Sequence, residues 1–160
     1  MATHDKTGKG GTTGHPSTGG RRPYLVENTS DVSDYDPAAG DIIQMIDVPA
    51  ETLVMAAGLE VLTASSNSVT FDLGITGSTA GHHDPDAWVD AYDATGTGHA
   101  PMDATDAAAM LIVKTADTID VLTAGAQDTA GKFRVWAVLC DISGVCLLYT
   151  SPSPRDRTRS

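Results

Sequence analysis

Val69-Thr-Phe-Asp-Leu-Gly-Ile-Thr76 is the clearest structural signal in this sequence, because its apolar and polar residues alternate without a break. The odd-numbered residues from Val69 to Ile75 are all apolar, and the even-numbered residues from Thr70 to Thr76 are polar or glycine. Successive side chains of an extended chain point to opposite faces, so this period of two predicts a β-strand. One face of the strand should pack on a core, and the other should meet solvent.

Further strand signals lie on both sides of this segment. The stretches 41–48 and 133–140 are apolar at odd and even positions, which predicts burial on both faces and, for the second, a place in a sheet interior. Gly58 should mark a bulge or bend in a long strand, and 107–114 should form a hairpin with 118–123. The other predicted strands are 24–27, 52–63 and 86–92.

Composition supports the same fold class. Thr, Val and Ile favour pleated sheets, the frequent Gly and Asp suit the turns between strands, and aromatic residues make up only 5% of the chain. No stretch shows the 3.6-residue apolar stripe of an amphipathic helix. About eight short strands separated by turns predict an all-β fold, a β-sandwich or jelly-roll-like domain.

The predicted organisation is one β-sandwich domain, residues 24–145, preceded by an arm of residues 1–23. The arm is rich in Gly and Thr and nearly free of large apolar side chains, so it should be disordered and flexible. Its basic residues suit an acidic neighbour, such as another copy of the chain, although a solvated tail explains them equally well. These candidate binding residues are Lys6, Lys9, Arg21 and Arg22.

Residues 146–160 differ from the rest because they are basic and rich in Ser and Pro. The run from Cys146 to Asp156 resembles the in-frame translation of a transposase-type sequencing adapter, and a natural Ser/Pro/Arg tail is the alternative. Under the adapter interpretation the native chain ends at an unknown point after Gly144. Removing three arginines and Asp156 changes the net charge from −11 to −13. Cys140 is then the single native cysteine, so no intramolecular disulfide is expected.

The formal net charge of −11 limits the partners of this chain. An acidic surface repels nucleic-acid phosphates and anionic lipids, so we expect no nucleic-acid and no membrane partner. No run of about 18 apolar residues occurs, and none is therefore predicted to span a bilayer. Residues 1–20 lack the apolar segment of a secretory signal.

The densest group of possible metal ligands is His82, His83, Asp84 and Asp86. Carboxylate-rich loops bind Ca²⁺, and His-rich loops bind Zn²⁺. The spacing, however, lacks the alternating acids, central Gly and distal Glu of an EF-hand loop. Adjacent histidines on an extended chain also point to opposite faces. We therefore predict a solvated loop with no metal and no other cofactor, and we keep these four residues as the metal candidates.

No catalytic arrangement is apparent in the sequence. Cys140 lies in the most apolar predicted strand, where a cysteine acts as a small hydrophobe, and no Gly-x-Ser-x-Gly elbow occurs. Paired aspartates such as Asp117 and Asp120 are typical of turns and solvated strand faces. The sequence therefore predicts a protein that is not an enzyme.

Two alternative functions involve the segment around residue 88. Trp88 and Tyr92 beside the Asp-rich loop would form a sugar platform in a tail-fibre or carbohydrate-binding β module, with a glycan as ligand. This interpretation requires an exposed Trp88, and a buried Trp88 would count against it. A metal-dependent enzyme using His82, His83 and Asp86 is the other alternative, and metal-free purified protein would exclude it.

Three stretches and a short ending carry a resemblance to a known family. They are Gly40-Asp-Ile-Ile-Gln-Met-Ile-Asp-Val-Pro-Ala-Glu-Thr-Leu53, Val69-Thr-Phe-Asp-Leu-Gly-Ile-Thr-Gly77, Thr115-Ala-Asp-Thr-Ile-Asp-Val-Leu122 and Arg134-Val-Trp-Ala-Val138. In this order they resemble virion structural proteins, of the capsid-decoration type, from marine tailed phages. The similarity spans about residues 22–142 and contains no catalytic motif.

The resemblance implies a β-sandwich that decorates or cements a phage capsid through surface complementarity. We therefore expect a non-enzymatic virion protein, made in the host cytoplasm and placed on the capsid surface. Its expected partners are the major capsid protein and further copies of itself, in a homo-oligomer such as a trimer. The sequence alone does not choose between a capsid and a tail position.

Overall fold

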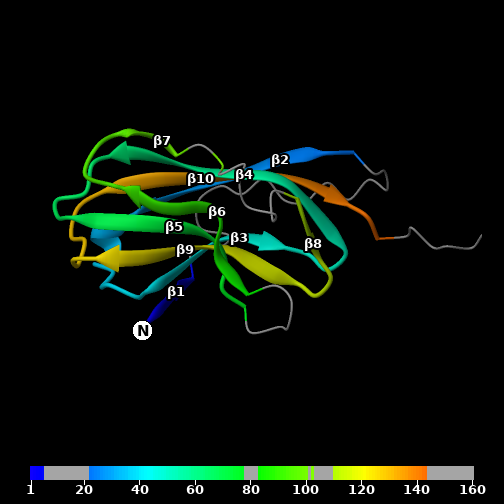
Figure 1. Cartoon of the computed structure of the whole chain (residues 1–160), viewed down its shortest axis with the longest axis horizontal. Coiled ribbons are helices and arrows are strands. Elements are labelled where there is room, and N and C mark those ends of the chain that lie inside the picture. The colour runs from blue at the N-terminus through cyan, green and yellow to red at the C-terminus, as the bar shows by residue number, and fades with distance from the viewer. Residues whose placement is uncertain (6–21, 78–82, 101, 103–109, 144–160) are drawn as a thin grey trace, which may run out of the picture.

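The computed structural model describes residues 1–5, 22–77, 83–100, 102 and 110–143. Within these residues, ten strands form two sheets that pack face to face (Figure 1). The first sheet has the strand order β1-β3-β9-β5-β6, and the second has the order β2-β10-β4-β7, with β8 also paired to β4. The predicted all-β sandwich is confirmed.

Paired strands in both sheets run antiparallel, except that β1 runs parallel to β3. A single 3₁₀ turn, Val32–Asp34, follows β2, and the described residues contain no helix long and apolar enough to cross a membrane. The first sheet consists of β1 (Thr3–Asp5), β3 (Ile42–Val48), β9 (Asp117–Gly125), β5 (Val69–Ile75) and β6 (Asp84–Asp93). The second consists of β2 (Tyr24–Asp31), β10 (Lys132–Asp141), β4 (Thr52–Thr63), β7 (Gly98–Ala100) and β8 (Leu111–Val113).

The core lies between the two sheets, and β5 contributes to it as its alternation predicts. Val69, Phe71, Leu73 and Ile75 are each at most 2% exposed. The Phe71 ring meets the ring of Phe133, from β10 of the opposite sheet, with centroids 4.9 Å apart. Burial of one such large apolar side chain stabilises the fold by about 1.5–3 kcal/mol, so these contacts hold the sheets together.

Apolar residues occupy both odd and even positions of β3, but not because both faces of the strand are buried. Ile43 and Met45 are buried, but so are Ile46 and Val48, because the pairing with β9 shifts between Gln44 and Ile46. A β-bulge places two residues opposite one and so reverses which parity faces inward. The predicted burial of β3 on both faces is therefore wrong. The sheet-interior position of β10 is confirmed, since it lies between β2 and β4.

Gly58 has a different role from the predicted bulge. It lies directly opposite Trp136 in β10, whose indole covers it on the outer face of the second sheet. A Cβ added at Gly58 would lie 2.6 Å from Trp136 Cζ2, so the glycine makes room for the ring. The register shifts between β4 and β10 occur elsewhere, beside Phe133 and Leu139.

The predicted hairpin of 107–114 with 118–123 is wrong. In the structure Leu111–Val113 pairs with β4 in the second sheet, whereas Asp117–Gly125 pairs with β3 and β5 in the first. The short segment between them carries the chain from one sheet to the other, so the two strands are not neighbours. Residues 103–109 lie outside the described part of the chain.

The start of the chain also differs from the predicted flexible arm. Residues Thr3–Asp5 form β1, which adds a parallel strand to the edge of β3. Thr-His-Asp has no apolar periodicity, so the sequence contains no strand signal there, and the pairing depends on backbone groups and on one buried side chain described below. Residues 6–21 of the predicted arm are outside the described residues, as are 144–160.

Candidate functional site

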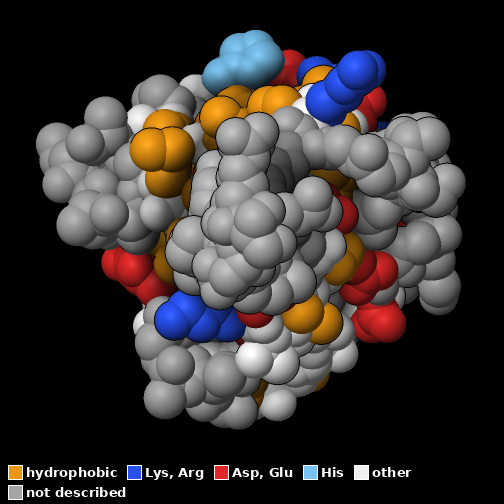
Figure 2. Space-filling model, turned by 90° about the vertical axis from the view of Figure 1, so that its right-hand side faces the viewer, with side chains coloured by type: hydrophobic (Ala, Val, Ile, Leu, Met, Phe, Trp, Pro, Cys, Tyr) orange, Lys and Arg blue, Asp and Glu red, His pale blue; other side chains and the backbone are white. Residues whose placement is uncertain are grey.

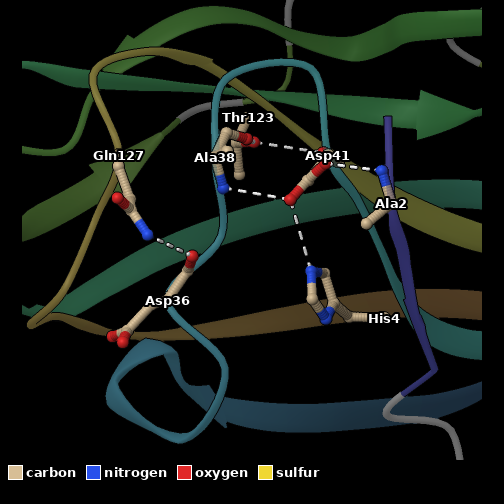
Figure 3. Close-up of polar contacts among 7 residues, drawn as sticks. All are labelled: Ala2, His4, Asp36, Ala38, Asp41, Thr123 and Gln127. Carbon is tan, nitrogen blue, oxygen red and sulfur yellow. Dashed lines mark hydrogen bonds and ion pairs between the residues drawn. The ribbon is translucent and has the colours of Figure 1, made fainter.

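One carboxylate gathers the contacts that fix the beginning of the chain. Asp41 directly precedes β3 and follows Gly40, whose φ of +86° is favoured by the absence of a side chain. Asp41 is 7% exposed. Its Oδ1 accepts a hydrogen bond from the Ala2 backbone N–H (2.6 Å), and its Oδ2 accepts one from the Ala38 N–H (3.0 Å) (Figure 3). The carboxylate thus joins the chain terminus to the loop before β3.

The loop around this carboxylate is fixed independently of β1. Thr123, buried on β9, donates its Oγ1 hydrogen to the carbonyl oxygens of Ala38 (2.6 Å) and Asp41 (3.1 Å). The Gln127 side chain donates to the Asp36 carbonyl at 3.0 Å (Figure 3). We call Ala38, Asp41 and Thr123 the Asp41 socket. Its contacts within the domain position the carboxylate to receive the Ala2 N–H.

The electrostatic environment favours the ionised form of Asp41. The two backbone hydrogen bonds hold the pKa of Asp41 below its ordinary value, as bonds to a charged carboxylate do. His4 Nε2 lies 3.4 Å from Asp41 Oδ2, and the His4 ring centroid lies 4.8 Å from that of Tyr35. Burial raises the pKa of Tyr35 to about 12, so its hydroxyl stays protonated. The socket therefore presents one negative charge to the β1 strand.

The backbone of β1 completes the attachment. The Ile42 N–H donates to the Ala2 carbonyl at 2.9 Å. Thr3, His4 and Asp5 then pair with the first three residues of β3 in parallel register. A strand at a sheet edge offers unpaired N–H and C=O groups to an extended segment, and the β3 edge with its socket accepts β1 in this way.

The outer face of the second sheet has a charged part. Arg134 on β10 forms an ion pair with Glu60 on β4, and its Nη1 lies 3.7 Å from Glu27 Oε2 on β2. His99 Nε2, on β7, lies 3.4 Å from Glu60 Oε1. These pairs cross β2, β10, β4 and β7, so they cover the middle of this face with charged and polar side chains.

The same face becomes apolar toward the start of β2 and the end of β10. In this apolar part, Leu25 lies opposite Val138, and Leu53 lies opposite both Cys140 and Ile112. Leu25 is 60% exposed and Ile112 is 44% exposed. Figure 2 views the molecule from this end and shows hydrophobic side chains at the surface among charged ones. Contiguous exposed apolar side chains are typical of protein interfaces.

The predicted metal candidates are only partly described. His83 is exposed, and its Nδ1 lies 3.3 Å from the Thr76 carbonyl, while Asp84 and Asp86 are partly exposed on β6. His82 is outside the described residues. Among the residues that are described, no three His, Cys, Asp or Glu side chains are grouped as metal ligands would be.

The structure places the predicted sugar platform in the core. Trp88 is 0% exposed and Tyr92 is partly buried against the core. An indole with no accessible face cannot stack on a glycan, so the burial of Trp88 counts against the carbohydrate-binding interpretation. Ala87, Trp88 and Val89 are all buried because β6 pairs irregularly with β5 on both sides of Leu73.

The remaining candidates divide between described and undescribed residues. Arg22 is exposed just before β2, whereas Lys6, Lys9 and Arg21 are not described. Cys140 is 8% exposed on β10, and its thiol lies 3.9 Å from the neighbouring Asp141 carbonyl. Beside Leu53 on the outer face of the second sheet, it acts as a small hydrophobe.

Sequence reasoning missed a buried acid on β9. Asp120 was predicted to lie in a turn or on a solvated face, but it is 1% exposed. Its Oδ2 accepts hydrogen bonds from the Thr76 N–H (3.2 Å) and hydroxyl, and its Oδ1 has no hydrogen bond within the described residues. Burial raises the pKa of Asp120, against the opposing effect of hydrogen bonds from Thr118 and Thr76. The flanking Ile119 and Val121 were the available signal.

No protein-family model matches this sequence, and no match is found among curated proteins. Solved structures do match the fold. A chain in the capsid of Ralstonia phage GP4 superposes with a TM-score of 0.57 and 19% sequence identity, and the match covers 88% of this chain and 98% of that one.

Two further capsids contain similar chains. In the cyanophage Pam1 capsid asymmetric unit, the TM-score is 0.55 at 18% identity, with 79% of this chain and 90% of that one covered. In the acidic stable capsid of Helicobacter pylori bacteriophage KHP30, the TM-score is 0.51 at 12% identity, with coverage of 74% and 86%. The sandwich as a whole, rather than one motif, is therefore similar in fold to chains of three phage capsids.

Proposed function

We propose that this chain is a structural protein of a phage capsid, which decorates or cements the shell in many copies and acts by binding, without catalysis. The observation that carries the proposal is the fold similarity to the Ralstonia phage GP4 capsid chain, of which 98% is covered. That capsid chain therefore consists of little more than the same sandwich. A chain of this kind suits a subunit that is added to a shell.

The charge of the chain supports an external position. With a net charge of −11, the domain would be repelled by nucleic acid packed inside a shell, since phosphate backbones attract basic and not acidic surfaces. The same charge limits non-specific association between particles. Both effects favour the outer surface of the capsid.

Two described surfaces suit assembly. The apolar part of the second sheet's outer face, around Leu25 and Ile112, offers contact area for the major capsid protein. The β3 edge, which holds β1 in the single chain, offers backbone hydrogen bonds to an N-terminal strand. The buried acids are occupied within the fold, since Asp41 receives donors from its own chain and Asp120 receives them from Thr76. Because both carboxylates hold parts of the fold together, they support a structural role.

Copy number in purified particles tests this function. Quantitative mass spectrometry of particles from a phage that encodes the chain should find it at a number comparable to the major capsid protein, or at a simple fraction of it. A handful of copies per particle would place the chain in the tail and contradict decoration. Complete absence from particles would contradict a virion role.

Variants of the apolar part test how the chain binds. Leu25→Asp combined with Ile112→Asp puts two charges where we infer the contact, at positions exposed enough to leave the fold intact. Capsid binding should weaken at least tenfold, which corresponds to about 1.4 kcal/mol. Leu62→Asp is the matched control, because Leu62 is 38% exposed at the opposite end of β4. Equal losses in both variants would contradict a contact through Leu25 and Ile112.

A further inference from the structure

We propose that the β3 edge, with its Asp41 socket, also receives residues 2–5 of a second copy of this chain, so that neighbouring copies are linked by exchange of β1. This inference deepens the proposed function, on which it rests for the place of exchange, because a capsid surface would bring many copies together. The partner is thus a second copy, and the recognised element is its N-terminal strand.

The first argument is that β1 is a separable element. It is three residues long and pairs along one edge with β3. Its polar contacts include those from Ala2 and His4 to Asp41, and that from Ile42 back to Ala2. Every one of these contacts depends on residues that each copy carries. An identical strand from a second copy therefore satisfies the same socket, which is why exchange of identical elements is a low-cost route to oligomers.

The second argument is the length of the connection. Sixteen residues separate Asp5 from Arg22, the first described residue before β2. An extended chain spans up to about 3.3–3.6 Å per residue, so this connection can reach roughly 55 Å. A compact domain of this size has a radius of gyration of roughly 15 Å. The strand can therefore reach a socket on an adjacent copy as well as its own.

The third argument concerns when exchange competes with self-docking. A short connection holds β1 near its own socket at an effective concentration of about the millimolar range. In dilute solution the intramolecular arrangement therefore dominates. Where copies are held side by side, the neighbouring socket is present at a similar local concentration, and exchange becomes competitive without any new contact.

The socket chemistry favours this occupant over an unrelated strand. The Ala2 N–H reaches the buried Asp41 carboxylate at 2.6 Å, while His4 lies between that carboxylate and the ring of Tyr35. Any non-proline residue in place of Ala2 would supply the backbone N–H, so the His4 imidazole, close to both Asp41 and Tyr35, is the group that an unrelated strand would lack. The N-terminal strand of the same chain supplies both groups.

Site-specific disulfide formation between two differently tagged chains tests the exchange. One full-length chain carries Thr3→Cys and the other Ile42→Cys, which are register partners in β1 and β3. Both chains also carry Cys140→Ala and Cys146→Ala. Neighbouring strands lie about 4.8 Å apart, within the range that a disulfide spans. A chain with both cysteines, Thr3→Cys and Ile42→Cys, reports docking within one copy.

We expect the double-cysteine chain to close an intramolecular disulfide when dilute. The two single-cysteine chains should form a disulfide-linked heterodimer when they are mixed at a concentration of about 1 mM. This concentration is of the same order as the effective concentration of β1 at its own socket. Thr3→Cys mixed with Thr70→Cys, which lies on β5 away from the edge, should form no heterodimer. Closure within one chain without any heterodimer would overturn exchange, and no closure in either format would overturn the docking itself.

A variant of the Asp41 socket tests whether the heterodimer yield depends on the socket or only on random collision of the two chains. Adding Asp41→Asn to the Ile42→Cys chain should lower the heterodimer yield at least fivefold, whereas Asp47→Asn, an exposed acid on the same strand, should leave it unchanged. Equal yields would overturn the role of the socket. The assay uses purified chain without capsids, so its failure is distinguishable from a failure of the capsid proposal, which the copy number in particles decides.

Discussion

Asp41, directly before β3, and Asp120, on β9, are both buried aspartates, yet their environments shift their pKa values in opposite directions. Asp41 receives hydrogen bonds on both oxygens, and these hold its pKa below the ordinary value. Asp120 accepts two hydrogen bonds from Thr76 on Oδ2, yet desolvation by burial outweighs its hydrogen bonds and raises its pKa. Desolvation is the largest influence on the pKa of Asp120 and a lesser one on that of Asp41, so the balance between desolvation and hydrogen bonds decides whether the charged form is favoured.

Asp41 and Asp120 also differ in the parts of the fold that they connect. Asp41 joins segments far apart in the sequence, since its donors come from residues 2 and 38. Asp120 fixes a local contact between β9 and the end of β5, through Thr76. The first is therefore an attachment point for a strand, and the second is a buried polar position within the sheet.

The largest effect is expected from removing the Asp41 charge. In Asp41→Asn the amide N–H₂ would face one of the two backbone N–H donors, and the loss of that bond should weaken β1 docking by about 1–3 kcal/mol. Hydrogen exchange of the Ile42 N–H, which donates to the Ala2 carbonyl, measures this directly. Asp47→Asn, on the exposed side of β3, should change the exchange rate little. Unchanged protection in Asp41→Asn would show that backbone pairing alone holds β1.

The next effect concerns the donors of Asp120. Thr76→Val removes the hydroxyl that donates to this carboxylate while keeping the side-chain shape, and we expect a loss of about 1–2 kcal/mol in the free energy of unfolding near neutral pH. Thr76→Ser keeps the hydroxyl and should recover most of the stability. Urea denaturation of both variants measures the difference. Equal stability of the Val and Ser variants would mean that the hydroxyl bond contributes nothing net.

Acidification should act on the two aspartates in opposite directions. The Asp41 contribution is fully present above the unfolded pKa of about 3.9 and is lost as the pH falls through its lowered folded pKa. Asp120 has a raised folded pKa, so its ionisation destabilises the fold as the pH rises through that value, and mild acid relieves this. Each change in the free energy of unfolding should be of the order of one hydrogen bond, about 1 kcal/mol.

Asp120→Asn isolates this pH dependence. The variant should gain stability relative to the parent at pH 7 and lose that advantage near pH 4, as seen in urea denaturation at the two pH values. Asp41→Asn should show the reverse, with its deficit largest at pH 7 and smallest below pH 4. Parallel curves for the two variants would contradict the opposite pKa directions.

The smallest effect is expected at His4. His4→Phe keeps a ring against Tyr35 but removes the Nε2 that lies 3.4 Å from Asp41 Oδ2. A partly exposed pair of this kind contributes about 0–1 kcal/mol, so β1 docking should weaken by no more than about 0.5 kcal/mol. Ile42 N–H exchange again measures it. A loss as large as that of Asp41→Asn would make His4, and not the Ala2 N–H, the main partner of the carboxylate.

The sequence predicted the fold class well where strands are regular. Residues 69–75 alternate without interruption, and β5 buries every odd-numbered residue of that run. Prediction failed in β3 and β6, where irregular pairing reverses the inward parity and Trp88 consequently enters the core. A bulge depends on the register with a distant strand, which a single sequence does not contain.

The candidate site was largely outside the reach of sequence reasoning. Thr3–Asp5 has no apolar residue, so its pairing depends on the unpaired edge of β3 and on one carboxylate 37 residues from His4. Asp41 itself was predicted only as the first residue of the strand 41–48, with no sign of a partner at the start of the chain. The charges of residues 6–22 suggested a binding arm, but the described contact of the arm uses residues 2–5.

The central place of β10 in the second sheet has a consequence for biosynthesis. β10 pairs with β2 on one side and β4 on the other, and it follows both in chain order. The second sheet can therefore be completed only after residues 132–141 leave the ribosome, whereas the strands β3, β5, β6 and β9 of the first sheet are already available. A nascent chain then exposes the inner apolar face of half a sandwich. Such an intermediate is prone to aggregation, so the synthesis of β10 ends the period in which this inner face is exposed.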